Sequence, residues 1–166
     1  MDWYEVTGEY HARTFEHACR LSSLPTDWQR ELAALWRLEG DVNNGGYLQF
    51  LTNWGKESYV YASQALKKMG AHTMAEIVDG CQALLDEHVP CEEMSLEELR
   101  RLLPNRVIDR QGRQIKDVGS LLPESVIARI YELSYRFMDY PDDVADLGRI
   151  HYRAYIEGDG RGRTDG

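Results

Sequence analysis

Apolar side chains recur at the three- and four-residue spacing of an α-helix along almost the whole chain. The segments with this spacing are separated by clusters of Gly, Pro, Ser and Asn, which end helices and form turns. The clearest segment covers residues 74–85 and is followed by Pro90. Further along, Ser95 and Glu98 have the spacing of a capping box, which begins a helix. The pattern predicts an all-α fold with about seven to eight helices.

The turn-forming residues set the expected helix boundaries. We expect a first helix that continues through Phe15 and Cys19 and ends in the Ser-Ser-Leu-Pro segment of residues 22–25. A second helix, with Thr26 as its N-cap, should end at the Asn-Asn-Gly-Gly segment of residues 43–46, because Gly and Asn adopt the left-handed conformation that ends helices. The other expected helices cover residues 47–54, 59–69, 74–85, 95–103, 126–138 and 144–155.

A chain of 166 residues is long enough to form one domain with its own hydrophobic core. We therefore expect a single compact helical domain over residues 1–157 and a flexible polar tail over residues 158–166, where glycine is frequent. Residues 105–119 have little helical character, and the stretch 106–116 fits a small hairpin.

The charge of the chain disfavours some classes of partner. The formal net charge is −9 and the isoelectric point is near 5.0, so the protein repels the phosphates of nucleic acids and anionic membrane surfaces. No apolar run is long enough to cross a bilayer and the N-terminal residues lack a signal pattern, so we expect a cytoplasmic protein. Cys19, Cys81 and Cys91 form no paired framework, which fits a reducing compartment.

The acidic residues are concentrated in two parts of the chain. Residues 69–99 hold eight carboxylates and no Lys or Arg. These acids are Glu76, Asp79, Asp86, Glu87, Glu92, Glu93, Glu97 and Glu98. The first four fall within about a 100° sector of the 74–85 helix, opposite its apolar stripe. Carboxylates fixed in this way can imitate a row of phosphate groups, although a solvated polar face is the more common reason for such residues.

A second acidic group surrounds the expected start of a helix at Pro141 and consists of Asp139, Asp142, Asp143 and Asp146. These residues can extend the row of carboxylates, or they can stabilise the helix by interacting with its macrodipole. Between the two groups, residues 100–116 hold six cations and one acid. This basic segment either pairs with the acids or forms a solvated loop.

Residues 39–55 join two of the expected helices and contain two adjacent Asn and two adjacent Gly residues. This composition predicts a tight reversal in which amide side chains bond to free backbone groups at the helix ends. Gln49 and Asn53 lie four residues apart and are expected to bond back to this turn, while Gly55 ends the short helix of residues 47–54. The alternative is that the amides form a notch that binds a ligand.

This segment resembles the signature of the DNA-mimic protein family, a set of small helical bacterial domains. The signature residues in this chain are Glu39, Asn43, Asn44, Gly45, Gly46, Tyr47, Gln49, Phe50, Asn53 and Gly55. The resemblance implies an acidic homodimer whose surface carboxylates imitate the phosphates of duplex DNA. Such a protein occupies the DNA-binding face of a helix-turn-helix repressor and relieves repression. The signature does not contain the mimicking carboxylates, so that role is expected of the two acidic groups.

The sequence offers little support for catalysis or metal binding. His11 and His17 are six residues apart, which is the wrong spacing for two metal ligands on one helix face. Glu87, His88 and Cys91 form a weak candidate metal cluster, because a His near a helix end is more often a capping or surface residue. No cysteine has an evident His and acid partner. We expect no enzymatic activity, no metal and no cofactor.

The sequence therefore predicts a DNA mimic that binds a DNA-binding protein, such as a transcription factor of the helix-turn-helix repressor type. One alternative is an immunity-type inhibitor that covers a basic toxin such as a nuclease, because the same acidic surface would serve both roles. Another alternative is a small enzyme or ligand-binding domain that uses the amides of residues 43–53 together with Glu39 or Asp41.

Overall fold

The structure is a computed structural model that describes residues 1–91, 93–103 and 122–161. In this part of the chain it contains seven α-helices and no β-strand, which confirms the all-α prediction. The α-helices are α1 (Trp3–Ala12), α2 (Asp27–Gly45), α3 (Tyr47–Met69), α4 (His72–Asp86), α5 (Leu96–Leu102), α6 (Glu124–Met138) and α7 (Val144–Ile156). Two short 3₁₀ helices, η1 (Phe15–His17) and η2 (Leu21–Ser23), precede α2, and a π-helical turn, η3 (Glu157–Arg161), follows α7. The segment 106–116, for which we expected a hairpin, lies outside the described residues.

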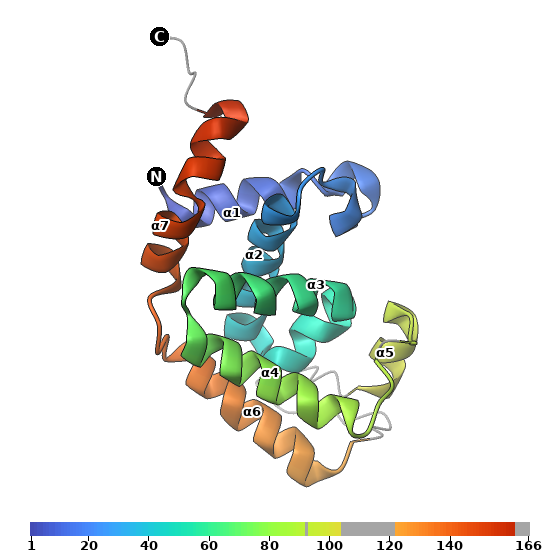
Figure 1. Ribbon diagram of the computed structural model, residues 1–166. Helices are drawn as coiled ribbons and strands as arrows, with labels where there is room; N and C mark the ends of the chain where they lie inside the picture. Colours follow the sequence, from blue (N-terminus) through green and yellow to red (C-terminus); the bar gives the residue numbers. More distant parts are fainter. Residues whose placement is uncertain (92, 104–121, 162–166) are drawn as a thin grey trace, which may run out of the picture.

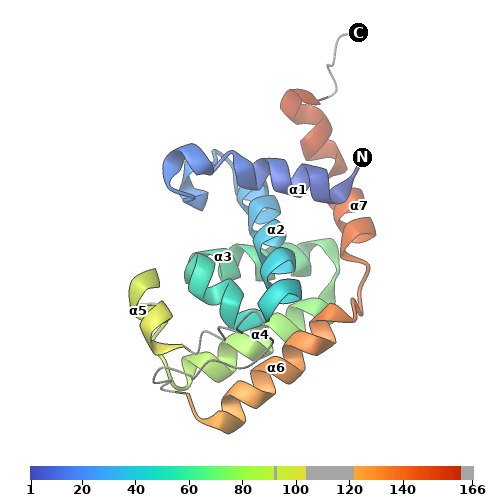
Figure 2. The ribbon, with the colours of Figure 1, turned by 180° about the vertical axis from the view of Figure 1, so that it is seen from behind.

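The helix α2 is the centre of the fold, and it is buried on most of its faces. The helix α1 crosses one end of α2, and α3 packs along it (Figure 1). The helices α4 and α6 lie side by side at the other end of the molecule, and α7 and α5 lie at opposite edges (Figures 1 and 2). Among the described residues, α4 and α7 each bury one face only.

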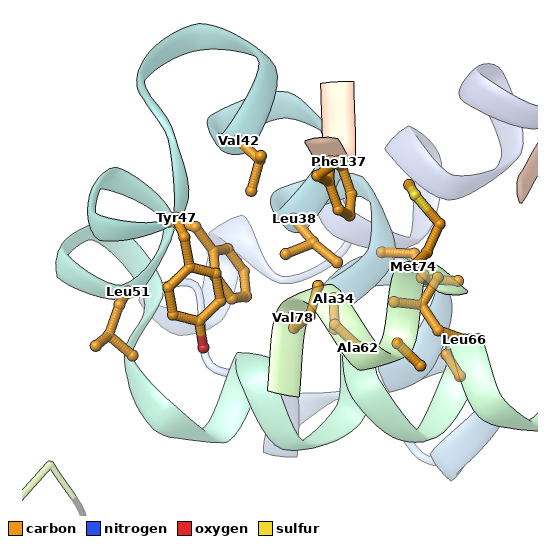
Figure 3. Close-up of a cluster of buried hydrophobic side chains, with 14 of the residues drawn as sticks. Ala34, Leu38, Val42, Tyr47, Leu51, Ala62, Leu66, Met74, Val78 and Phe137 are labelled. Atoms are coloured by element: carbon orange, nitrogen blue, oxygen red, sulfur yellow. The ribbon is translucent and has the colours of Figure 1, made fainter. Parts of the chain in front are cut away.

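The part of the core shown in Figure 3 is formed by apolar side chains of α2, α3, α4 and α6. Leu38 and Val42 of α2 meet side chains of α3, α4 and α6, among them Tyr47, Met74 and Phe137. The polar atoms of Tyr47 are satisfied within this core, because its hydroxyl donates to Gln82 Oε1 at 2.7 Å and its backbone amide donates to Ser134 Oγ at 3.0 Å. A core of this kind holds α4 as a rigid rod on the rest of the domain.

Two glycines set the path of the chain around this core. Gly46 lies between α2 and α3 with φ 86° and ψ 177°, and Gly55 bends α3 with φ 73° and ψ −178°. This region of backbone conformation is essentially restricted to glycine. The predicted end of the second helix at residues 43–46 and the predicted break at Gly55 are both confirmed.

Replacing Gly46 with alanine should lower the free energy of unfolding by about 2 kcal/mol, because alanine strains the backbone there. The added Cβ would also lie 3.3 Å from Ser134 Oγ and Tyr131 Cε1. Gly40→Ala, in an exposed turn of α2 with no atom within 4 Å of the added Cβ, is the matched control and should stabilise the protein by up to about 1 kcal/mol. Urea denaturation measures both changes. Equal effects of the two substitutions would contradict the assignment of strain to Gly46.

The first helix is shorter than predicted. It ends at Ala12, where the carbonyl of His11 accepts hydrogen bonds from the backbone amide and the hydroxyl of Thr14. Ala18 and Cys19 then adopt positive φ angles of 54° and 58°, which a helix cannot include. The expected continuation through Cys19 is therefore wrong. The second helix begins after Thr26 as predicted, although the Thr26 side chain makes no capping hydrogen bond.

The C-terminal end of the described chain is attached to α1. Asp159 accepts hydrogen bonds from the Tyr10 hydroxyl at 2.9 Å, from Arg13 Nη1 at 3.1 Å and from Gln29 Nε2 at 3.3 Å. These contacts continue the folded body past residue 157, where we expected the tail to begin. Residues 162–166 of the expected tail lie outside the described residues.

Candidate functional site

The four carboxylates predicted on the outer face of α4 divide into two pairs. On the side that faces α3, Lys67 Nζ lies 2.6 Å from Asp79 Oδ2, and Lys56 Nζ lies 3.1 Å from Asp86 Oδ2. On the other side, Glu76 and Glu87 are exposed and make no ion pair with any described residue. The predicted exposure is therefore wrong for Asp79, which is half-buried, and right for Asp86, which is exposed but paired with Lys56.

Asp79 is the most strongly held of the four. It is half-buried and accepts hydrogen bonds from the Ser63 hydroxyl at 2.6 Å and the Tyr59 hydroxyl at 3.1 Å, in addition to its pairing with Lys67. Burial raises the pKa of the Asp79 carboxyl, but the hydrogen bonds from Lys67 and the two hydroxyls outweigh burial and lower this pKa below its ordinary value. Asp79 is thus ionised and neutralised within the protein, and it joins α4 to α3.

The exposed pair on α4 has a regular separation. Glu76 and Glu87 are eleven residues apart on the same side of the helix, which corresponds to about 16 Å along its axis. Asp139, at the C-terminal end of α6, and Glu93, after α4, are also exposed without an ion pair among the described residues. We call Glu76, Glu87, Glu93 and Asp139 the free carboxylates.

The remaining acids of the first group have local partners. Glu97 forms an ion pair with Arg101, four residues later on α5. The Glu98 carboxylate accepts hydrogen bonds from the backbone amide and hydroxyl of Ser95, which confirms the predicted capping box and lowers the pKa of Glu98. Glu92 lies outside the described residues.

The second acidic group is mainly structural. Asp142 Oδ2 accepts a hydrogen bond from the Met74 backbone amide at 2.8 Å, so Asp142 caps α4 from a distant part of the chain. Asp143 caps α7 by accepting from the Asp146 backbone amide at 2.9 Å, and Asp146 forms an ion pair with Arg149. Asp142 and Asp143 therefore both interact with helix N-termini, which was the structural alternative for this acidic group. Asp142, however, caps α4 rather than α7.

The basic segment of residues 100–116 is described only at its start. Arg100 Nε donates to the Thr52 carbonyl at 2.9 Å, and Arg101 pairs with Glu97. Residues 104–116 lie outside the described residues. In the part that is described, the lysines that neutralise acids of α4 come from α3 instead.

The protein surface as a whole is strongly acidic. The described residues include 24 of the 28 acidic residues of the chain and 14 of its 19 Lys and Arg residues. Among these acids only Glu31 and Glu39 are buried. The surface therefore carries a large excess of carboxylates even though several of them form ion pairs.

The signature segment is organised around Asp41, one of the two acids that the ligand-binding alternative placed beside the amides. Its carboxylate accepts hydrogen bonds from Gln49 Nε2 at 3.0 Å, Asn53 Nδ2 at 3.1 Å and Trp54 Nε1 at 2.6 Å. Gln49 and Asn53 were expected to bond to the backbone of the turn, but they bond to this carboxylate. One N–H group of each of these two amides is therefore used within the protein.

Glu39 and Asn43 join the signature to the region between α6 and α7. Glu39 Oε1 accepts from Trp3 Nε1 at 3.1 Å, and Glu39 Oε2 accepts from the Tyr140 hydroxyl at 3.3 Å. Asn43 Nδ2 donates to the Glu39 carbonyl at 2.8 Å and to the Tyr140 hydroxyl at 2.7 Å. Burial raises the pKa of Glu39 to about 7, although the hydrogen bonds that it accepts oppose this effect. Tyr47 and Phe50, the aromatic residues of the signature, lie in the core.

Within residues 1–91, 93–103 and 122–161, no three His, Cys, Asp or Glu side chains come together in a way that could hold a metal ion. In the same residues, no helix has both the length and the apolar character needed to cross a membrane.

Comparison with known proteins gives one match. A sequence model described as DMP19-like protein matches residues 22–158, which include α2 to α7. No curated protein and no solved structure matches this chain.

Proposed function

The chain belongs to the DMP19-like protein family, and we propose that it is a DNA mimic that binds the DNA-binding surface of a transcription factor of the helix-turn-helix repressor type and blocks its operator binding. The resemblance of residues 39–55 to the signature of DNA-mimic proteins supports this proposal. The observation that carries it is the excess of exposed carboxylates, including the free carboxylates on a rigid helical body.

The physical basis of the proposal is competition for cationic side chains. A DNA-binding protein uses Lys and Arg to neutralise phosphates, so carboxylates held at fixed positions can occupy the same side chains. Glu76 and Glu87 lie along α4, and the cap from Asp142 to Met74 keeps the C-terminal end of α6, with Asp139, near the start of α4. Complementary charge accelerates association and makes binding weaken steeply as salt is added.

We also propose that the protein acts as a homodimer, as the resemblance implies, and that it has no enzymatic activity. An inhibitor of a basic toxin would use the same carboxylates. The two roles differ in the partner, because only a DNA-binding regulator would be released by its own operator DNA.

A charge-reversal experiment tests the proposal. The immobilised protein is used to capture bacterial proteins at low salt, and the captured protein is released with operator or random duplex DNA. The double variant Glu76→Lys, Glu87→Lys should bind the captured regulator at least about tenfold more weakly, because it replaces two attractive charges with repulsive ones. Its free energy of unfolding should change little, since both residues are exposed.

The control has the same change in net charge at a different place. Glu5→Lys, Glu16→Lys reverses two exposed carboxylates on α1 and η1 and should retain most of the affinity. Equal losses in the two variants would mean that net charge rather than the α4 surface determines binding. A complex that does not weaken with salt, or that duplex DNA does not displace, would contradict DNA mimicry.

A further inference from the structure

The outward side of the helix α7 carries exposed apolar side chains, although Leu147 on this side packs partly against the core. One face of α7 is buried by Val144, Gly148, Tyr152 and Ile156. Gly148 lies against the ring of Trp3 so closely that an added Cβ would be 2.2 Å from Trp3 Cη2. This close packing fixes the rotation of α7, so its opposite face must point away from the domain.

The outward face carries Ile150, whose 72% exposure is the highest among the large apolar side chains described. Leu147 is half-buried and Ala154 is exposed, and these residues precede and follow Ile150 by three and four positions. This spacing gives a second apolar stripe along one side of the helix. We call Leu147, Ile150 and Ala154 the α7 outer face. In both views α7 lies at an edge of the molecule, where a partner can reach it (Figures 1 and 2).

We propose that the α7 outer face is the surface on which two copies of this chain pack, with their α7 helices antiparallel and a two-fold axis at Ile150. This inference specifies the interface of the homodimer and rests on that part of the proposed function. Ile150 is the central residue of the helix Val144–Ile156, so a two-fold axis there gives the two helices their greatest overlap. The buried centre would be Ile150 against its symmetry copy, flanked by Leu147 of one copy and Ala154 of the other.

The charges beside the stripe favour a second copy over a cationic partner. Each copy has a net charge of −9, so two copies repel each other unless the surfaces that meet are locally neutral. The outward side of α7 and its C-terminal end carry both signs of charge, from Asp146, Arg149, Arg153 and Glu157. A cationic DNA-binding protein would meet two arginines here, whereas it meets carboxylates on α4.

The order of these charges also fits an antiparallel pair. Asp146 lies four residues before Ile150 and Arg153 lies three residues after it, so antiparallel packing places Asp146 of one copy beside Arg153 of the other at both ends of the interface. Arg153 has no ion pair with another described residue. Within one copy the two side chains are seven residues, or about 10 Å, apart along the helix and do not pair.

The oligomeric state of the purified protein tests this interface without any DNA-binding partner. Light scattering after gel filtration should show a dimer for the wild type. Ile150→Glu should raise the dimer dissociation constant at least about thirtyfold, because it places two carboxylates at the centre of an apolar contact. Val60→Glu, at an exposed valine on α3, should leave the dimer unchanged. A monomeric wild-type protein would contradict the proposed homodimer. A dimeric Ile150→Glu variant would contradict the proposed interface but not the homodimer.

A charge exchange tests the register of the two helices. Asp146→Arg and Arg153→Asp should each weaken the dimer, and the double variant should recover it. The two exchanged side chains are too far apart to pair with each other within one helix, so a direct pair between them forms only between copies. Arg149, which pairs with Asp146 within one copy, is unchanged in all three variants. Circular dichroism confirms that each variant keeps the helical fold. Failure of the double variant to recover the dimer would contradict the antiparallel register. If the protein is a dimer but not a DNA mimic, the results of the Ile150→Glu and charge-exchange experiments should be the same.

Discussion

Replacing Arg37 with methionine should lower the free energy of unfolding by about 3 to 5 kcal/mol. Arg37 lies on α2, is 2% exposed and has no carboxylate within ion-pair distance among the described residues. Its guanidinium lies 4.3 Å from the centre of the Trp54 ring, and burial lowers its pKa to about 10. Arg37 therefore remains charged at neutral pH and is stabilised by dipoles and an aromatic face.

The dipoles around Arg37 come from three parts of the chain. Its Nε donates to His11 Nδ1 at 3.1 Å, and its Nη1 donates to the Ser58 hydroxyl at 3.0 Å. Its Nη2 donates to the Thr14 hydroxyl at 3.2 Å and to the Cys19 carbonyl at 2.7 Å. Methionine has a similar length but no donor, so the substitution leaves these acceptors without a partner in a buried site.

The control for Arg37 is Arg129→Met on the surface of α6. Arg129 pairs with Glu132, and both side chains are exposed, so its loss should change the free energy of unfolding by less than about 0.5 kcal/mol. Urea denaturation at neutral pH compares the two variants. If Arg37→Met costs as little as Arg129→Met, the hydrogen bonds of Arg37 do not hold the segment between α1 and α2 in place.

Helix boundaries could be predicted from the sequence where the signal is local. Gly46 and Gly55 stop helices because of their own backbone freedom, and the Ser95–Glu98 capping box involves residues three positions apart. The end of the first helix could not be predicted in this way. Cys19 fits the helical spacing, but the chain turns before it, and its carbonyl accepts a hydrogen bond from Arg37, 18 residues later.

The candidate site was predicted less well, because ion pairs form between helices. The sequence shows a stretch of 31 residues without cations, from 69 to 99, but it does not show that α3 lies alongside α4. Lys67 and Lys56 precede their partners Asp79 and Asp86 by 12 and 30 residues. The spacing of these acids along α4 correctly predicts that they lie opposite its apolar stripe. Which of them are neutralised depends on the packing of α3 against α4.

The burial of polar groups on α2 was not predicted, for a related reason. Arg37 and Asp41 lie about one turn apart on one side of α2 and Glu39 lies on the opposite side, and charged residues at such positions are usually solvated. Because α2 is surrounded by other helices, Arg37 and Glu39 are buried and Asp41 is half-buried, and each is bonded to groups from α1, α3 or the α6–α7 connection. The central position of α2 depends on how the whole domain packs. It cannot be predicted from the spacing of apolar residues in one segment.

Replacing Glu39 with glutamine should change how stability depends on pH. Burial raises the pKa of Glu39 to about 7 in the folded protein, whereas the unfolded chain has the ordinary value of 4.5. Between these two values the folded state holds a proton that the unfolded state has lost, so the contribution of Glu39 to stability falls as pH rises. The loss amounts to about 3 kcal/mol across this interval, because each unit of pKa difference corresponds to about 1.4 kcal/mol.

His11 produces the opposite trend in wild-type protein. Burial and the charge of Arg37 lower the pKa of His11 to about 4 from the ordinary 6.5, so its contribution to stability is lost as pH falls through this range. The trends of Glu39 and His11 oppose each other between about pH 4.5 and 6.5. Glu39→Gln removes only the first trend and should leave a stability that rises with pH in this interval.

The difference between variant and wild type isolates Glu39, because every other titrating group is common to both proteins. The free energy of unfolding of Glu39→Gln minus that of the wild type should rise by about 3 kcal/mol from pH 4.5 to 7. Urea denaturation at a series of pH values measures this difference. A flat profile for Glu39→Gln would mean that the folded protein does not raise the pKa of Glu39, and that the carboxyl between Trp3 and Tyr140 is solvated rather than buried.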